Sequence, residues 1–595
     1  MAPDIIFYNG QFKGAGTFQK KISAAAIKNK SFFKFGSDKE ILALKNDSTK
    51  IIDLKKKLVI PGLNDSHIHL IRGGLSFNME LRWDGIKNLS DALFLLKEQA
   101  DRTPPPQWVR VVGGWTEFQF KEKRMPTLDE INSVSKETPV FILHLYDRAL
   151  LNQAALKAIG YDKNTKEMPG TTIQRDKAGN PTGMLIATPN AIILYSALAK
   201  GSKLNTADQI NSTLHFMREL NRLGITSVVD AGGGFQNYPE DYEIINQLNN
   251  ENKLSIRIAY NLFTQKPGHE LEDFQNWIQT TNYQQGNDYY RHNGAGEMLV
   301  FTAADFEDFL QERPDLPPVM ESQLEPVVKL LAKHQWPFRL HATYDESITR
   351  ALTIYEKINN EIPIDKLNWF FDHAETISDH SIERVKKLGG GIAIQNRMAF
   401  QGEYFIDHYG KEKTLRTPPI KKLLDAEIPV GLGTDATRVS SYNPWLSLYW
   451  ATTGKTMGGA SLYNESNILS REKALELYTK GSAWFSNEQD KKGSFIEGQF
   501  ADFAVLSKDY FTIPEEEIKD LYSVMTVLGG VIVHASDEFV SDNPPLPPVS
   551  PEWSPIKYYG TYGNNKIIIE NKQHSFECAT HSDPHFNLGC FCWAF

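Results

Sequence analysis

The 595-residue sequence predicts an α/β fold, a (β/α)8 TIM barrel that carries a small β-sandwich and an inserted lid subdomain. Three observations predict the barrel. Between residues 61 and 485, short apolar runs alternate with amphipathic stretches of helical length, as parallel strands joined by helices require. Eight such runs can be counted. Several of them end in histidine or aspartate, as barrel strands do where they reach an active face.

The eight expected barrel strands are residues 63–70, 225–230, 255–262, 297–301, 338–343, 369–375, 391–396 and 429–435. The interval 71–205 between the first two strands is too long for a single crossover, so we expect an inserted lid subdomain there. It holds two further strand-like runs, 109–113 and 140–145.

The two flanks of the barrel share a β-rich character and are expected to form one β-sandwich from residues 1–60 and 486–542. The barrel then occupies residues 61–485, and a C-terminal extension, 543–595, follows. All three cysteines lie in that extension, within the last 18 residues. Five residues of the extension carry thiol or imidazole groups and are compatible with a structural metal site, a disulfide or buried thiols: Cys578, His581, His585, Cys590 and Cys592.

The amino-acid composition disfavours some classes of binding partner. The 64 basic and 73 acidic residues leave a net charge of −9 without a basic block, which disfavours nucleic acid and anionic membranes. The N-terminus lacks a secretory pattern, and no run approaches the ~18 apolar residues of a membrane span. We therefore expect a soluble, cytoplasmic protein that acts on a small molecule.

The clearest chemical signal is His67-Ile68-His69 on the first expected strand. Residues two apart on a strand point to the same face, so both imidazoles project together. His341, His373 and Asp435 stand at the ends of later strands. Each alone is also typical of a hydrogen-bonded core histidine or a capping aspartate, but together they predict a metal site at the active face.

Sequence motifs also resemble the amidohydrolase superfamily, and within it the branch of N-substituted formamide deformylase-like proteins. The resemblance covers about residues 1 to 540. Its motifs are PGLNDSHIHL (61–70), NQAAL (152–156), PTGML (181–185), ITSVVDAG (225–232), LHATYD (340–345), DHAE (372–375), GLGTDA (431–436) and GSFIEGQFADFAVL (493–506).

The resemblance implies one or two divalent ions, usually Zn²⁺, held by His67, His69, His341, His373 and Asp435. Members with two ions need a bridging ligand, often a carboxylated lysine after strand four, yet no lysine occurs between Pro267 and Val328. We therefore favour one Zn²⁺, with His373 as a weak or neighbouring ligand. In the two-ion alternative, His341 and His373 hold the second ion.

The predicted reaction is hydrolysis of a C–N bond in an amide or formamide, with Asp435 as general base and His373 donating to the carbonyl oxygen. The alternatives are a deaminase or cyclic amidine hydrolase with the same centre, or a ligand-binding or regulatory protein on an inherited barrel. Family resemblance leaves a homo-oligomer open. Asp147 stands where the family commonly has a histidine. Seven residues are candidates for the substrate pocket: Trp115, Phe118, Phe120, Arg148, Gln395, Arg397 and Arg438.

Overall fold

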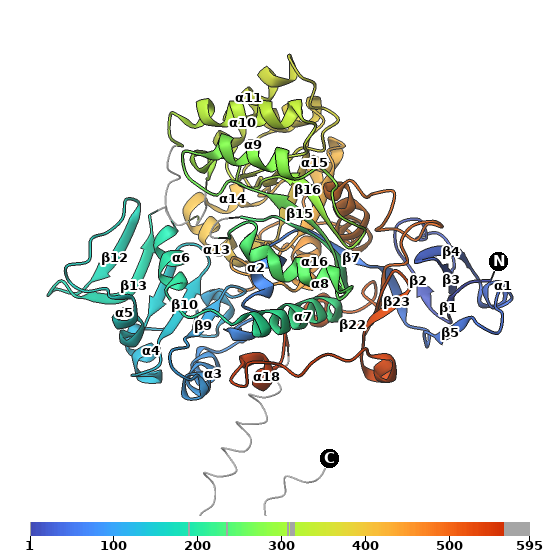
Figure 1. The fold of residues 1–595 in the computed structure, drawn as a ribbon, viewed down its shortest axis with the longest axis horizontal. Helices are drawn as coiled ribbons and strands as arrows, with labels where there is room; N and C mark the ends of the chain where they lie inside the picture. The colour runs from blue at the N-terminus through green and yellow to red at the C-terminus, as the bar shows by residue number, and fades with distance from the viewer. Residues whose placement is uncertain (1, 189–190, 234–235, 306–308, 310–315, 564–595) are drawn as a thin grey trace, which may run out of the picture.

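The computed structural model describes residues 2–188, 191–233, 236–305, 309 and 316–563 (Figure 1). Its centre consists of two four-stranded parallel sheets. The first has the order β16-β15-β14-β7 and the second β17-β18-β19-β20. Their strands are β7 (Leu63–Ile68), β14 (Ile225–Asp230), β15 (Arg257–Leu262), β16 (Tyr290–Ala295), β17 (Arg339–Ala342), β18 (Phe370–His373), β19 (Gly391–Gln395) and β20 (Val430–Gly433).

Backbone hydrogen bonds join the two sheets at both seams. Between β20 and β7, Asp435 N donates to His67 O at 2.8 Å and His69 N donates to Ala436 O at 2.9 Å. Between β16 and β17, Ala295 N donates to Pro337 O at 2.9 Å. The eight strands are thus arranged as in a (β/α)8 barrel, but as two half-sheets with local contacts at the seams rather than one continuous ladder.

Amphipathic helices cover the outside of the strands because each buries one apolar face against them. In Figure 1 they surround the central strands at the top and front. They include α7 (Thr206–Arg222), α8 (Glu243–Asn250), α9 (Glu270–Thr280), α10 (Met320–Lys333), α11 (Asp345–Asn359), α12 (Asp379–Lys387), α13 (Met398–Tyr409) and α16 (Pro444–Thr453). The apolar side chains of Val229 on β14, Phe370 on β18, Ala393 on β19 and Phe485 pack together in a buried cluster of their own.

The prediction for the fourth barrel strand was wrong. The strand is β16, Tyr290–Ala295, and the apolar run 297–301 after it is a connection that ends in a short 3₁₀ turn. β16 carries Arg291, His292 and Asn293, which made it resemble a loop. These polar groups are satisfied inside the fold: Arg291 lies 3.3 Å from Glu488, and Asn293 donates to Phe485 O at 3.0 Å. The other seven expected strands overlap the observed ones.

The interval between β7 and β14 folds into a separate six-stranded sheet beside the barrel, at the left in Figure 1. Its order is β12-β13-β11-β10-β9-β8. The strands are β8 (Glu80–Leu81), β9 (Val109–Val112), β10 (Val140–His144), β11 (Arg148–Leu151), β12 (Thr171–Arg175) and β13 (Pro181–Ala187). Helices α3 (Leu89–Arg102), α4 (Leu128–Val134), α5 (Gln153–Ile159) and α6 (Ile192–Ala199) flank them.

This inserted sheet touches the barrel next to the end of β20. Gly113, at the end of β9, has φ +69°, and a Cβ there would lie 2.0 Å from Thr437 O. Glycine therefore allows the insertion to pack closely on the loop that follows Asp435. Arg82 reaches the same loop, since its Nη1 donates to Thr437 O at 3.3 Å.

Strands from both chain flanks pair in a second region, at the right in Figure 1. β6 (Leu58–Pro61) pairs antiparallel with β21 (Phe503–Leu506) in a five-stranded sheet that also contains β2 (Gln11–Phe12), β22 (Ser523–Leu528) and β23 (Val531–Ala535). A four-stranded sheet faces the same apolar core: β1 (Ile5–Tyr8), β3 (Ala24–Lys28), β4 (Ser31–Gly36) and β5 (Lys50–Asp53).

The first part of the C-terminal extension lies along the barrel. The side chain of Asn78 donates to Ser550 O at 2.8 Å, that of Asn211 donates to Pro548 O at 2.9 Å, and α18 (Pro555–Tyr559) follows. The predicted sites at Cys578, His581, His585, Cys590 and Cys592 lie outside the described residues. Among the residues described, no helix has the length and apolarity needed to cross a bilayer.

Candidate metal centre

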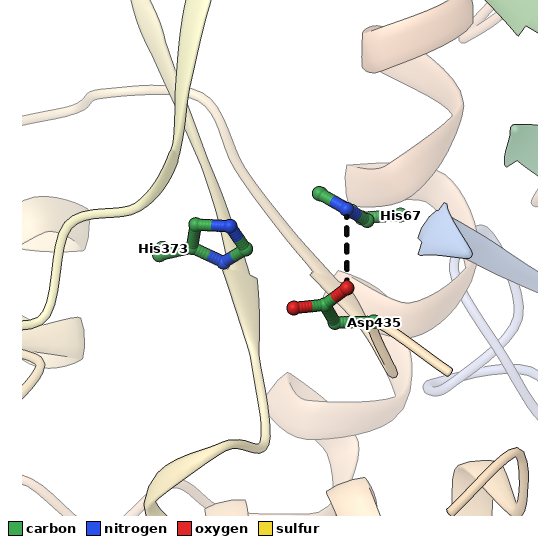
Figure 2. A group of neighbouring side chains, drawn as sticks. All are labelled: His67, His373 and Asp435. Carbon is green, nitrogen blue, oxygen red and sulfur yellow. Dashed lines mark ion pairs between the residues drawn. The ribbon is translucent and has the colours of Figure 1, made fainter. Parts of the chain in front are cut away.

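The barrel brings all five predicted ligands together at the C-terminal ends of its strands. His67 lies on β7 and His69 directly after it, and both face Asp435, with His67 Nε2 at 3.4 Å and His69 Nε2 at 3.2 Å from Asp435 Oδ1. Figure 2 shows His67 and His373 on either side of the Asp435 carboxylate. His67, His373 and Asp435 all lie within ligand distance of one another and are buried.

Glu297 completes the group, and sequence reasoning missed it. Its carboxylate lies between two pairs of histidines. One pair is His67 and His69, each with Nε2 3.7 Å from a Glu297 oxygen. The other is His341, with Nδ1 at 3.3 Å, and His373, with Nε2 at 3.5 Å. The absence of a lysine after strand four therefore does not exclude a ligand shared by two ions, because Glu297 lies at that place.

The backbone before Glu297 explains how it reaches the centre. Gly296 has φ +111°, and a Cβ there would lie 2.1 Å from Arg339 O. Only glycine tolerates both that conformation and that close approach. The chain therefore turns sharply at the end of β16 and delivers the carboxylate among the histidines. Gly294 and Gly296, just before an acidic residue, are the sequence signal that could have revealed it.

Positive φ angles occur at two other ligands, His373 (φ +79°) and Asp435 (φ +56°). Non-glycine residues in this region store strain that the surrounding structure must hold. For Asp435 that support comes from Asp65 below the centre. The Asp65 carboxylate accepts hydrogen bonds from His67 N at 3.0 Å and from Thr434 N at 3.1 Å, so it ties β7 to the end of β20.

A buried carboxylate orients the first histidine. His67 Nδ1 lies 2.9 Å from Asp372 Oδ1, and Arg339 Nε donates to the other Asp372 oxygen at 2.7 Å. In the neutral ring, a proton on Nδ1 would leave the lone pair of Nε2 facing Glu297 and Asp435. Burial lowers the pKa of His67, but Asp372 and then Glu297 and Asp435 outweigh it and raise the pKa to about 10. The centre thus carries negative charge that a cation would neutralise.

The donor set fits a metal ion. His67 Nε2 is completely buried and has no hydrogen-bond partner among the described residues, although it faces two carboxylates at 3.4 and 3.7 Å. Two ligands in a tetrahedral site with bonds of about 2.1 Å are about 3.4 Å apart, so these separations suit shared coordination better than a hydrogen bond. Imidazole and carboxylate are the ligands that Zn²⁺ and related ions accept.

Asp372→Asn tests the orientation of His67. Since the amide cannot hold the proton of Nδ1 as a carboxylate does, we expect metal affinity to fall 10- to 100-fold while the protein stays folded. The measurement is a competition titration with a metal chelator, with circular dichroism as the check on folding. An unchanged affinity would show that Arg339 and the barrel alone orient the ring.

The candidate pocket residues divide into three groups. Trp115 and Phe120 belong to the core of the insertion, and the Phe118 ring packs against Tyr404. Arg148 pairs with Asp147. Gln395, Arg397 and Arg438 remain near the barrel mouth. Sequence reasoning also missed buried His144, whose Nδ1 lies 2.6 Å from Asp147 and whose Nε2 lies 2.7 Å from Glu117.

Gln395 and Arg397 lie next to the metal centre. Ala393 points into the barrel interior, so Gln395, two residues later on β19, points to the same side near the strand end. The Gln395 side chain is 1% exposed, and neither of its amide atoms has a hydrogen-bond partner among the described residues. Arg397 lies 2.8 Å from Glu375 and 3.8 Å from Asp435.

Comparison with known proteins agrees with this geometry. The sequence pattern of the amidohydrolase family matches residues 50–534. The chain belongs to this family. It is 24% identical over 508 residues to the N-substituted formamide deformylase of Arthrobacter pascens, covering 84% of this chain and 92% of that protein. It is 25% identical over 539 residues to the putative amidohydrolase YtcJ of Bacillus subtilis (strain 168), covering 88% and 94%.

Amidohydrolase membership also agrees with the solved structures. A metal-dependent hydrolase from Pyrococcus furiosus matches with a TM-score of 0.61 and 22% identity, covering 85% of this amidohydrolase and all of that chain. At this level of identity the match shows the fold. It supports a (β/α)8 barrel as the frame on which the histidines and carboxylates are placed.

Proposed function

We propose that this amidohydrolase is a metal-dependent hydrolase that cleaves the C–N bond of a small amide or formamide. The observation that carries the proposal is the position of Glu297, whose carboxylate lies between His67 and His69 on one side and His341 and His373 on the other. Similarity over 92% of the Arthrobacter formamide deformylase supports the choice of a C–N bond.

The arrangement supports two ion sites rather than the single one favoured from the sequence. His67, His69 and Glu297 form one group of ligand atoms within mutual reach, and Glu297, His341 and His373 form another. Asp435 adds a carboxylate to the first group. Zn²⁺ suits this set of imidazole and carboxylate donors. When bound, such an ion supplies Lewis-acid chemistry: it acidifies water and polarises the scissile carbonyl.

The residues of the chain then provide positioning and proton transfer. Burial disfavours the ionised form of Asp435, but His67 and His69 hold its pKa well below the ordinary value, so it stays a carboxylate. Asp435 accepts a proton from the attacking water and delivers it to the leaving nitrogen. Arg397, 3.8 Å from Asp435 Oδ2, limits the direction in which that carboxylate faces.

His373 was expected both as a ligand and as a donor to the substrate carbonyl, and the contacts of its ring favour the first role. Its Nε2 lies 3.0 Å from His341 Nδ1 and 3.5 Å from Glu297, so it belongs to the second ligand group. We therefore propose it as a ligand rather than as the donor to the substrate carbonyl. Gln395, whose buried amide has no hydrogen-bond partner among the described residues, is the better candidate to hydrogen-bond the substrate.

The test is a screen of the zinc-loaded protein against N-formyl compounds, N-acyl amines, cyclic amides and amino-substituted heterocycles, with acid, amine and ammonia measured separately. Release of acid and amine in equal amounts supports amide hydrolysis. Release of ammonia would indicate the deaminase or cyclic amidine alternative. Tight binding of panel members without turnover, at full metal content, would favour a ligand-binding protein.

A further inference from the structure

Most of the arginines buried in the described part of the chain pair with a carboxylate, whereas Arg438, which is partly exposed, does not. Five of them lie within 4 Å of a carboxylate: Arg82 with Asp84, Arg257 with Asp502, Arg291 with Glu488, Arg339 with Asp372 and Arg397 with Glu375. Arg438 has no carboxylate within that distance among the described residues, and its Nη1 is buried without a hydrogen-bond partner. A guanidinium nitrogen that is buried without a partner is poorly solvated, so an anion from outside the chain would stabilise it.

Arg438 lies among aromatic and cationic side chains, namely Tyr195, Tyr146 and Arg72. Its guanidinium lies 4.4 Å from the centre of the Tyr195 ring on α6 of the insertion, and the Tyr195 ring packs edge-on against Tyr146 at 5.8 Å. Burial lowers the pKa of Arg438, and the positive charge of Arg72 lowers it further. Two like charges near each other increase the attraction for an anion.

Arg438 and its aromatic neighbours lie within reach of the metal centre. Arg438 is three residues after Asp435, a span of at most about 11 Å between the two Cα atoms. Tyr146 connects the two places. Burial raises the pKa of the Tyr146 phenol, and Asp435 and Glu297 are both near enough to raise it further. A molecule the size of an amino acid derivative can therefore contact the centre and Arg438 together.

We propose that Arg438 binds the carboxylate of the substrate, so that the enzyme acts on N-formyl or short N-acyl amino acids. This inference deepens the proposed function and rests on it. A guanidinium pairs with a carboxylate through two parallel hydrogen bonds, and Tyr195 holds it in place from one side. We favour a monoanion because a phosphate dianion would be repelled more strongly by Asp435 and Glu297. Since a formyl group carries no side chain, the carboxylate belongs to the amine part.

The experiment compares each acid with its uncharged methyl ester. N-formylglycine and both enantiomers of N-formylphenylalanine are assayed against their esters with zinc-loaded wild type and with Arg438→Gln. We expect the wild type to prefer at least one acid, and the variant to lose that preference by about 100-fold, mainly through a higher KM. Arg438→Lys should recover part of it. No preference for the acid in any pair would overturn the proposal, as would an unchanged preference in Arg438→Gln.

Two controls keep the outcome clear. Arg471→Gln removes another guanidinium that lies over a tyrosine ring, 5.8 Å from Tyr510, and should leave the preference unchanged. If neither acids nor esters are cleaved, the proposed reaction fails on these compounds, and calorimetric Kd values for the same pairs decide the role of Arg438. Binding of an acid that exceeds binding of its ester and disappears in Arg438→Gln supports the site, and equal binding overturns it.

Discussion

Glu297→Gln should lower kcat by about 1,000-fold or more and reduce the zinc content from two ions per chain to one or none. The reason is geometric. One carboxylate faces all four histidines at 3.3 to 3.7 Å, and an amide offers a single neutral oxygen in its place. A weaker ligand at a shared position affects both ion sites together. Elemental analysis and turnover, measured on the same preparation, check the two expectations.

Glu219→Gln is the matched control for that variant. Glu219 is also buried, at 2% exposure, but it pairs with Arg222 in α7 at 2.7 Å. Its loss should lower stability without changing metal content. The zinc count should be repeated on a chain that ends at residue 563, which removes the cysteines of the extension from the measurement. Two ions and activity within tenfold of wild type in Glu297→Gln would contradict the shared-ligand interpretation.

Periodicity located the barrel because its strands are apolar where they pack against helices. In β14 and β19, branched and small residues occupy both faces, so the sequence pattern predicts these strands correctly. The prediction missed β16 because the polar residues of this strand pair with groups far away in the chain, such as Arg291 with Glu488. Local sequence contains no information on such partners, so a polar strand looks like a loop.

The same limit applies to the centre. His67 and His69 could be assigned because two residues on one strand must share a face. Glu297 could not, because its place depends on a turn at Gly296 that is fixed by close contact with Arg339 O. The strand predicted at residues 297–301 also placed Glu297 at the start of a strand, whereas it follows the end of β16. Arg438 was one of the candidate pocket residues, but Tyr146 and Tyr195, which connect it to the centre, come from the insertion.

Asp435→Asn separates proton transfer from metal binding. His67, His69 and Glu297 remain as ligands in this variant, so most of the metal should stay bound. Turnover should nevertheless fall by about 1,000-fold or more, because an amide oxygen cannot accept and return a proton at neutral pH. Metal content and kcat on the same sample are the measurement.

The pH dependence gives this variant a second readout. With Asp435 as base, its protonation limits activity on the acid side, and in the asparagine variant the remaining activity should no longer follow that titration. Asp502→Asn removes another buried carboxylate, one that accepts from Arg257 Nε at 2.7 Å, and should keep the acid limb. Activity within tenfold of wild type would exclude Asp435 as the base. If metal is lost together with activity, the main role of Asp435 is that of a metal ligand. The proton would then have to pass through Glu297, the carboxylate that faces all four histidines.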